Sequence, residues 1–590
     1  MRRQVLFINL SEYEHWTEEF EVEEWLGGVG AAVRLMRKHV SSDTDPLGEK
    51  NAVVLSTGLF TPAYPMASKC VGMFRSPLTG TLGESHAGGR VAACIANAGY
   101  LAVVITGRAE EPVYVVVDND RVHFRDARAI WSVRDSIVVG RIIAKREGGA
   151  GVRSVLRIGA AGSNLVRFAC VNTETYRHFG RLGMGAVFGS KRLKALVVSG
   201  RGAFKPAKLS CYRRIYREIF SRITSWREAK KYYTLGTAAN VQPLNEMRAL
   251  PSLNLKSTSF DGAEGISGEA FAERVLGRRV ACSHCPVACI HIGALRVPYG
   301  DEPYFYKTLM VGYDYELIYS LGSMLGIGSA EDVLRLINQV ERLGMDAIST
   351  GVALAWATEA LERGVISERQ SLVRLRFGDA ASYLRAIEHL ASGTNEFYRD
   401  LGMGVEHASG VYGGREFALS FGGNEMPGYC TGYGAYIGYL IGSRHSHLDA
   451  GGYELDQKLA KEAERLSPEE LVDRLVAREV EKQLLSTLVV CFFARSIYSP
   501  GLVAQAFEPL GLELTPEELM ERAERIYAEK QRYRQELGFS AAELRVPERV
   551  MEREALGSRL SREYFERALE YFAGRYLQSS SNLRQEALRE

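Results

Sequence analysis

The sequence has little of three features that narrow a function early: it carries almost no net charge, its cysteines suggest no disulfide framework, and we expect no secretion signal. Its 590 residues carry 73 Lys and Arg against 71 Asp and Glu, a formal net charge of +2. This balance gives no reason to expect a nucleic-acid partner or a charged membrane surface. Nine cysteines, most of them isolated, fit a reducing compartment better than a disulfide framework. We therefore expect a cytoplasmic protein.

Long apolar runs are also scarce. The run after Arg2 and Arg3 is too short for a signal peptide, and acidic residues follow from Glu12 onward. Residues 426–443 are uncharged over a length that raises the question of a membrane span. Five of these residues are Gly and four are Tyr. The segment therefore predicts a buried glycine-rich loop and helix, and we expect no membrane span.

A chain of this length is expected to fold into several domains. The N-terminal part contains short apolar, β-branched runs separated by Gly and Asn or Asp turns, which is typical of strands. These runs are residues 52–56, 101–105, 113–117 and 193–199. After Lys208 the periodicity becomes helical, and Ser329, Ser467 and Thr515 each form a helix-start signal.

These patterns predict an α+β protein, in which an N-terminal β-sheet domain precedes two mainly α-helical domains. We place the domains at residues 1–207, 208–423 and 424–590, with Gly422 and Gly423 as the best boundary between the helical parts.

The most informative motif is a compact cysteine trio, Cys282, Cys285 and Cys289, with Cys491 far downstream. Four thiolates can hold one iron-sulfur cluster. Cys-x2-Cys is also a zinc half-site, and His284 or His291 can complete a Cys3His set. Structural zinc sites usually consist of two Cys/His pairs, so the spacing favours a cluster, with zinc as the alternative.

Glycine clusters in the β-rich part suggest an anionic ligand. They lie at residues 27–30, 76–89 and 180–191. Such loops can present backbone N–H groups to phosphates, while Lys or Arg adds charge. A single cluster is more often a tight turn. Three in one domain favour a bulky anionic cofactor.

Several further segments, together with the cysteine trio, resemble a known family. They are residues 74–80, 98–107, 158–169, 185–191 and 343–351. In this order and over nearly the whole chain, the sequence resembles the tungsten-containing aldehyde ferredoxin oxidoreductases. The resemblance implies a tungsten bis-molybdopterin between the domains, a [4Fe-4S] cluster and a Mg²⁺ ion that bridges the pterin phosphates.

The resemblance also implies roles for individual residues. The cluster ligands are Cys282, Cys285, Cys289 and Cys491. The cofactor-binding residues are Lys69, His86, Gly88, Arg181, Ala186, Asp346 and Ser486. Among them, Asp346 begins the first pterin motif, Lys69 faces a phosphate, and the backbone carbonyls of His86 and Ala186 hold the magnesium.

Glu316 and His447 occupy the family's acid-base positions, and the resemblance implies that both are catalytic. Without it, each is more often a structural residue. The sequence departs from the family pattern at Ser486, where an aspartate is usual, and adds a second imidazole at His445. A serine can donate or accept a hydrogen bond but supplies no charge.

By resemblance the protein oxidises an aldehyde with water to the carboxylic acid. Electrons then pass through the cluster to ferredoxin or to an iron-sulfur partner subunit, within a homodimer or a hetero-oligomer. One alternative is a tungsten reductase subunit of a larger complex that acts on acids or acyl-CoA. Another is a non-catalytic electron relay, held by an iron-sulfur cluster or by zinc, that has lost the pterin.

Overall fold

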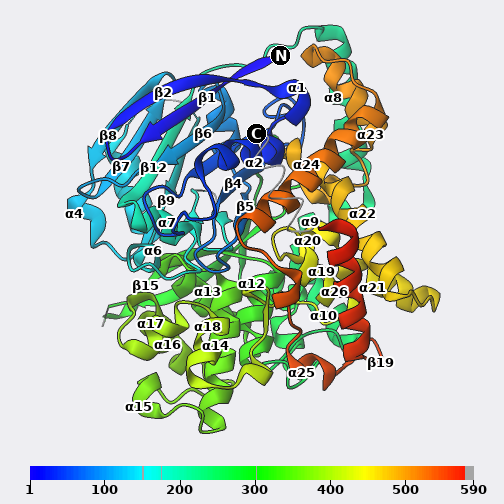
Figure 1. Ribbon diagram of the computed structural model, residues 1–590. Helices are drawn as coiled ribbons and strands as arrows, with labels where there is room; N and C mark the ends of the chain where they lie inside the picture. The colour runs from blue at the N-terminus through cyan, green and yellow to red at the C-terminus, as the bar shows by residue number, and fades with distance from the viewer. Residues whose placement is uncertain (149–151, 175, 301, 578–590) are drawn as a thin grey trace.

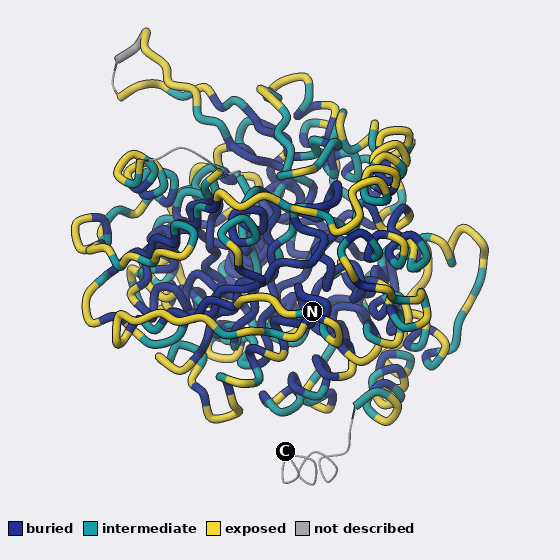
Figure 2. Tube along the Cα trace, turned by 90° about the horizontal axis from the view of Figure 1, so that it is seen from above, coloured by how far each residue is buried: buried dark blue, intermediate teal, exposed yellow. Residues whose placement is uncertain are grey.

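The computed structural model describes residues 1–148, 152–174, 176–300 and 302–577. Figure 1 shows a β-rich N-terminal lobe in blue and cyan above green helices from the middle of the chain, with orange and red C-terminal helices alongside. Buried residues gather in the centre of the molecule, as Figure 2 shows. The predicted fold class is confirmed.

The described part of the N-terminal lobe contains two six-stranded sheets. The first has the order β2-β1-β6-β3-β4-β5. Its strands are β1 (Arg2–Asn9), β2 (Glu14–Glu21), β3 (Val53–Ser56), β4 (Cys70–Arg75), β5 (Leu82–Ala87) and β6 (Tyr100–Thr106). β1 and β6 pair in parallel, and the other neighbours pair antiparallel.

The second sheet has the order β11-β10-β9-β12-β7-β8. Its strands are β7 (Val113–Asp118), β8 (Arg121–Asp126), β9 (Val152–Arg157), β10 (Val171–Asn172), β11 (His178–Phe179) and β12 (Leu193–Gly200). Leu6 and Ile8 on β1 share one core with Val115 and Val117 on β7, so the two sheets pack face to face. Alternate residues on β1 join a second core with the helix α2 (Gly28–His39), as the two-residue period of a strand requires.

The other helices of this lobe are short and surround the sheets. They are α1 (Val22–Trp25), α3 (Val91–Asn97), α4 (Arg128–Trp131), α5 (Ser136–Arg146), α6 (Ala160–Ser163) and α7 (Met184–Ser190).

The rest of the chain is mainly helical. The middle part contains α8 (Leu209–Ser225), α9 (Arg227–Thr234), α10 (Val241–Glu246), α11 (Gly268–Arg274), α12 (Tyr315–Leu321), α13 (Ala330–Leu343), α14 (Ala347–Glu362), α15 (Glu368–Ser371), α16 (Ala380–Ser392), α17 (Glu396–Leu401) and α18 (Val405–Tyr412). The C-terminal part contains α19 (Tyr433–Ile441), α20 (His447–Ala450), α21 (Gly452–Glu462), α22 (Pro468–Thr487), α23 (Pro500–Phe507), α24 (Pro516–Glu536), α25 (Glu548–Met551) and α26 (Arg562–Tyr576).

The three predicted helix starts form in the structure. Ser329 accepts a hydrogen bond from the backbone N–H of Asp332 at the start of α13. Ser467 and Thr515 each form a capping box at the starts of α22 and α24. In each case the cap satisfies backbone donors that the first helical turn leaves free.

A small sheet interrupts the helical part, which the sequence patterns did not predict. It contains β13 (Leu276–Val280), β14 (Ile290–Tyr299) and β15 (Glu302–Tyr313) in antiparallel order. Two further two-stranded pairs are β16 (Ser420–Phe421) with β17 (Asn424–Glu425), and β18 (Glu554–Ala555) with β19 (Ser558–Arg559). Gly422 and Gly423 form the turn between β16 and β17, so the domain boundary suggested there stays a prediction.

The uncharged segment 426–443 forms a buried loop followed by α19, as predicted. Among the described residues, no helix combines the length and the apolar composition that a membrane crossing requires.

The contact between α2 and the end of α22 should be sensitive to a single methyl group. A Cβ on Gly28 would lie 2.3 Å from the backbone oxygen of Thr487, and φ of Gly28 is +46°. Gly28→Ala should therefore lower the free energy of unfolding for two reasons. The left-handed backbone conformation costs free energy in any residue with a Cβ, and the close contact should cost about 1 to 3 kcal/mol in addition. The control is Gly364→Ala, since Gly364 has a φ of +72° and no described atom lies within 4 Å of the position that a Cβ would take there. If urea unfolding shows that both variants lose the same free energy of unfolding, the close contact at Gly28 is contradicted.

Candidate functional site

The four cysteines that the sequence singles out are brought to one corner of the structure. Cys282, Cys285 and Cys289 lie in the loop between β13 and β14, and Cys491 follows α22. Met66 joins the two segments, because its N–H donates to the His284 carbonyl at 2.9 Å and its carbonyl accepts from the Cys491 N–H at 3.0 Å. The backbone of Met66, in the N-terminal lobe, thus holds the loop of the cysteine trio next to Cys491. We call this pair of hydrogen bonds the Met66 clamp.

The surroundings of the two histidines argue against a Cys3His zinc site. His291 Nδ1 lies 3.1 Å from the Cys289 carbonyl, and Nε2 lies 3.1 Å from two further backbone carbonyls. Both ring nitrogens are therefore engaged with the backbone. His284 is exposed. Among the described residues, no group of three His, Cys, Asp or Glu side chains is arranged to hold a single metal ion. A multi-iron cluster does not require such an arrangement.

Gly88 and Lys69 lie against this cysteine corner. A Cβ on Gly88 would lie 2.8 Å from Cys282 Sγ and 3.7 Å from Lys69 Nζ. The Lys69 N–H donates to the carbonyl of Val489, two residues before Cys491. Burial raises the pKa of Cys289 to about 12, and the positive charge of Arg177 is among the effects that oppose the increase. Positive charge nearby therefore favours ionisation of the Cys289 thiol.

Glu316 and His447 lie next to each other, although 130 residues separate them in the sequence. Glu316 is on the first turn of α12, and His447 begins α20. His447 Nε2 lies 3.2 Å from Glu316 Oε1, and the Gly428 N–H donates to Glu316 Oε2 at 3.0 Å. Within the described residues, the contact with His447 does not have hydrogen-bond geometry, so Glu316 Oε1 forms no hydrogen bond, and His447 Nδ1 has no hydrogen-bond partner.

Burial favours the neutral forms of this pair. It raises the pKa of Glu316 from 4.5 to about 8, although the Gly428 hydrogen bond and Arg181 oppose the increase. Burial, followed by Arg181 and Arg444, lowers the pKa of His447 well below its usual value. A carboxyl group with a pKa near neutrality can both accept and release a proton under physiological conditions.

Asp346 lies at the N-terminus of α14 and connects it to Arg181. Its carboxylate accepts from the N–H groups of Ile348 and Ser349, and Arg181 Nε lies 3.3 Å from Oδ2. The Ser349 hydroxyl lies 2.6 Å from both Asp346 Oδ2 and Glu425 Oε2. One hydroxyl proton serves one acceptor. Because burial raises the pKa of Glu425, its carboxyl can supply the second proton of this chain.

His86 belongs to a buried charge network between the N-terminal and C-terminal parts. His86 Nε2 lies 2.7 Å from Glu84 Oε1, and Lys530 Nζ on α24 lies 2.6 Å from Glu84 Oε2. Arg444 pairs with Asp449 at 2.5 Å and lies 4.0 Å from Glu84. Ala186 is buried in α7, and His86 is partly buried. Both residues proposed to bind magnesium therefore lie in the protein interior or just beneath the protein surface.

The residues fit a large polar cofactor, because buried polar atoms without a partner are concentrated in these segments. Native proteins leave few such atoms unsatisfied. Those on residues that the sequence singles out, or beside them, are Arg181 Nη1, Glu316 Oε1, His447 Nδ1, Asp449 Oδ1, Gln483 Nε2, Ser486 Oγ and Thr487 Oγ1.

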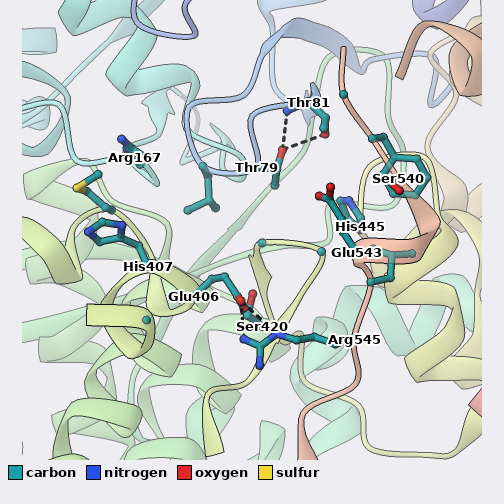
Figure 3. A pocket seen from close by; sticks show the side chains of 18 of the residues that line it. Thr79, Thr81, Arg167, Glu406, His407, Ser420, His445, Ser540, Glu543 and Arg545 are labelled. Carbon is teal, nitrogen blue, oxygen red and sulfur yellow. Dashed lines mark hydrogen bonds and ion pairs between the residues drawn. The ribbon is translucent and has the colours of Figure 1, made fainter. Parts of the chain in front are cut away.

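A separate cavity of about 570 Å³ lies where Leu78 and Thr79 meet residues 403–423 and 538–545. Figure 3 shows His445 in its wall and the ion pair between Glu406 and Arg545 at its side. Glu316 and His447 do not line it. His445 Nδ1 lies 2.9 Å from the Tyr439 carbonyl and Nε2 lies 2.7 Å from Arg534, so the added imidazole is held by the protein.

Sequence reasoning missed two contributions to the site. The first is Arg177, which lies 3.6 Å from Asp314 and close to Cys282. Its position just before the third glycine cluster was the available signal. The second is a wall of buried tyrosines around Glu316: Tyr315, Tyr319, Tyr429 and Tyr439. The tyrosine-rich composition of segment 426–443 was a signal for part of this wall.

Comparisons with known proteins agree over the whole chain. The family described as "Aldehyde ferredoxin oxidoreductase, N-terminal domain" matches residues 5–200, and "Aldehyde ferredoxin oxidoreductase, domains 2 & 3" matches residues 214–590. The tungsten-containing aldehyde ferredoxin oxidoreductase of Thermococcus kodakarensis is 30% identical, covering 93% of this chain and 91% of that protein. Its namesake from Pyrococcus furiosus is 29% identical, covering 92% and 90%.

Two further proteins are similar. The WOR-like subunit of an aliphatic sulfonate oxidoreductase from Pyrococcus furiosus is 30% identical and covers 62% of this chain and 60% of that subunit. Among solved structures, the active site complex BamBC of benzoyl coenzyme A reductase, in complex with 1,5 dienoyl-CoA, has a TM-score of 0.81 at 19% identity. The match covers 100% of this chain and 98% of that chain, and it shows a shared fold.

The raised pKa of Glu316 predicts a pH-dependent stability difference in cofactor-free protein. As pH rises from 4.5 to about 8, the unfolded carboxyl loses its proton first, so ionisation progressively destabilises the folded state. The full penalty, at most about 5 kcal/mol, applies above the folded-state pKa. Glu316→Gln removes it, so the melting temperature of the variant relative to wild type should rise between about pH 5 and pH 8. A difference that stays constant over this range would contradict the buried carboxyl.

Proposed function

Because the chain belongs to the aldehyde ferredoxin oxidoreductase family, we propose that it oxidises an aldehyde with water to the carboxylic acid. The electrons leave through a [4Fe-4S] cluster to ferredoxin or to an iron-sulfur partner subunit. The observation that carries this proposal is the buried pair Glu316 and His447, with Nε2 and Oε1 3.2 Å apart, and with His447 Nδ1 unpartnered among the described residues.

The proposed cofactors are a tungsten bis-molybdopterin, a [4Fe-4S] cluster and a bridging Mg²⁺ ion. When bound, the metal-pterin supplies oxygen transfer and two-electron redox chemistry, and the cluster supplies single-electron transfer. Cys282, Cys285, Cys289 and Cys491 would ligate the cluster. Asp346 and Ser486 would bind the pterin rings, Lys69, Gly88 and Arg181 the phosphate side, and the carbonyls of His86 and Ala186 the magnesium.

The chain's own residues would manage the protons. In its ionised form, Glu316 Oε1 takes a proton from water or from the hydrated aldehyde, and a pKa of about 8 makes that carboxylate a stronger base than an ordinary one. His447 stays neutral, since burial lowers its pKa, and its unpartnered Nδ1 can hydrogen-bond the substrate. Tyr315, Tyr319 and Tyr429 are buried around the pair and exclude bulk water.

A second candidate function is a reductase subunit of a larger complex, acting on an acid or an acyl-CoA. It is supported by the likeness to a sulfonate oxidoreductase subunit and by the fold shared with the BamBC complex. In this case the electrons flow in the reverse direction, from an iron-sulfur partner subunit. A homodimer or hetero-oligomer in the cytoplasm fits either function.

Metal and pterin analysis of anaerobically purified protein tests the cofactor set. Tungsten or molybdenum with pterin and about four irons per chain supports an enzyme. Iron without pterin indicates an electron relay, and zinc alone indicates a structural site. Aldehyde-dependent dye reduction, compared with dye-driven reduction of the acid or acyl-CoA, then distinguishes the two directions.

Replacing one cysteine tests the cluster assignment. Cys285→Ser should remove most of the iron and the paramagnetic signal of the reduced protein, because the cluster would lose one of four thiolates. Cys211→Ser is the matched control, since Cys211 is similarly half-buried but its thiol contacts Glu508. Full iron content in both the Cys285→Ser and Cys491→Ser variants would show that the ligands are wrong.

Three substitutions separate the catalytic pair from its neighbour. Glu316→Gln keeps the shape of the side chain and removes the base, so turnover per tungsten should fall by about 100-fold or more. His447→Ala should also retain the metals and lose rate. His445→Ala should affect turnover less, because Tyr439 and Arg534 occupy its ring nitrogens. Near-wild-type turnover in both Glu316→Gln and His447→Ala, measured anaerobically, would refute the mechanism and leave the cofactor assignment intact.

A further inference from the structure

The last turn of α22 carries three buried polar side chains on one face. Gln483, Ser486 and Thr487 are separated by three and four positions, which places them together on the helix surface. Their exposed fractions are 0%, 1% and 0%. Only Ser486 stands out in the sequence, as the position where the related family has an aspartate.

Each of the three has a polar atom without a partner among the described residues: Gln483 Nε2, Ser486 Oγ and Thr487 Oγ1. A buried helical hydroxyl usually bonds the carbonyl one turn earlier. Thr358 on α14 shows this arrangement, since its hydroxyl lies 2.7 Å from the Leu354 carbonyl and 2.9 Å from Tyr383. The cluster on α22 is therefore not explained by intrahelical bonding.

Contacts connect this cluster to the segments assigned to the cofactor. Lys530 Nζ lies 3.2 Å from Gln483 Oε1 and 2.6 Å from Glu84 Oε2. Glu84 in turn contacts His86 at 2.7 Å. Ser486 also precedes Cys491 by five residues, and the Met66 clamp fixes that cysteine. The unpartnered polar atoms thus lie on a segment that contacts the candidate site at Gln483 and, beyond the helix, at Cys491.

We propose that Gln483, Ser486 and Thr487 together bind the ring edge of the second pterin through uncharged hydrogen bonds. They would replace the single carboxylate that the resemblance places at position 486. This proposal rests on the proposed function, because it requires a pterin. The ring edge of a pterin presents N–H donors beside a carbonyl acceptor. The two hydroxyl oxygens accept from the ring, and the Gln483 amide donates to the carbonyl.

The experiment compares pterin content per chain in wild type and in Ser486→Ala/Thr487→Val, purified anaerobically as the complete protein. Pterin is measured as its fluorescent oxidation product. The double variant should contain about half the pterin of wild type and keep its cluster iron. Gln483→Glu, which retains an acceptor for Lys530 and removes the amide donor, should also lose pterin. Iron content reports folding, and the single variant Ser486→Ala replaces the double variant if that variant does not fold.

A second readout does not depend on the loaded enzyme. In protein produced without tungsten or molybdenum, Thr487→Val replaces an unpartnered buried hydroxyl by a methyl group, so its melting temperature should rise by about 1 to 3 °C. Thr358→Val is the matched control. It removes a hydroxyl that is already bonded, so its melting temperature should fall while its pterin content stays at the wild-type value.

Unchanged pterin content in Ser486→Ala/Thr487→Val and in Gln483→Glu would overturn the proposal, as would a fall in the cofactor-free melting temperature of Thr487→Val. Wild-type protein that contains cluster iron but no pterin would instead refute the proposed function, and this inference with it. Because wild type is measured first, the two failures are distinguishable.

Discussion

The buried ion pair between Glu84 and Lys530 holds the N-terminal sheet against the C-terminal helices. Both side chains are fully buried, and their charged atoms lie 2.6 Å apart. Burial alone would raise the pKa of Glu84, but Lys530 and the His86 hydrogen bond lower it overall, so the carboxylate stays ionised. Removing one partner of such a pair typically costs about 3 to 5 kcal/mol, because the other charge is left uncompensated. The position of His86 and Gln483 depends on this contact.

The same interface explains why the site contains so many unsatisfied polar atoms. Sheets and helices that meet around Glu84 bring several charged and polar side chains out of water together. Where a partner is present, as for Arg444 and Asp449, the charges compensate. Where none is present, as for Ser486 and Thr487 among the described residues, the cost of burial is offset only when a ligand supplies the missing hydrogen bonds. Ligand binding and docking of the lobes should therefore be thermodynamically linked.

Local signals predicted much of the fold. The β-branched runs at 52–56 and 193–199 form the strands β3 (Val53–Ser56) and β12 (Leu193–Gly200), and Ser467 and Thr515 cap helices, because these features act within a few residues. The sheet of β13, β14 and β15 was not predicted, because the segments on both sides of it have helical periodicity. The turn signal at Pro298–Gly300 was available. The uncharged, glycine- and tyrosine-rich composition of segment 426–443 predicted a buried loop and helix, and α19 is buried.

The members of the candidate site were named from the sequence and remain predictions, whereas their contacts could not be named from it. Resemblance identified Glu316 and His447, yet only tertiary structure shows that Oε1 and Nε2 lie 3.2 Å apart and that burial shifts both groups toward neutrality. The resemblance also showed that Ser486 stands where the related family usually has an aspartate. Hydrogen-bond satisfaction is not visible in sequence, so Gln483 and Thr487 carried no signal there. Their polar atoms are unpartnered among the described residues, and on our proposal they replace the lost carboxylate by an uncharged recognition surface spread over three positions.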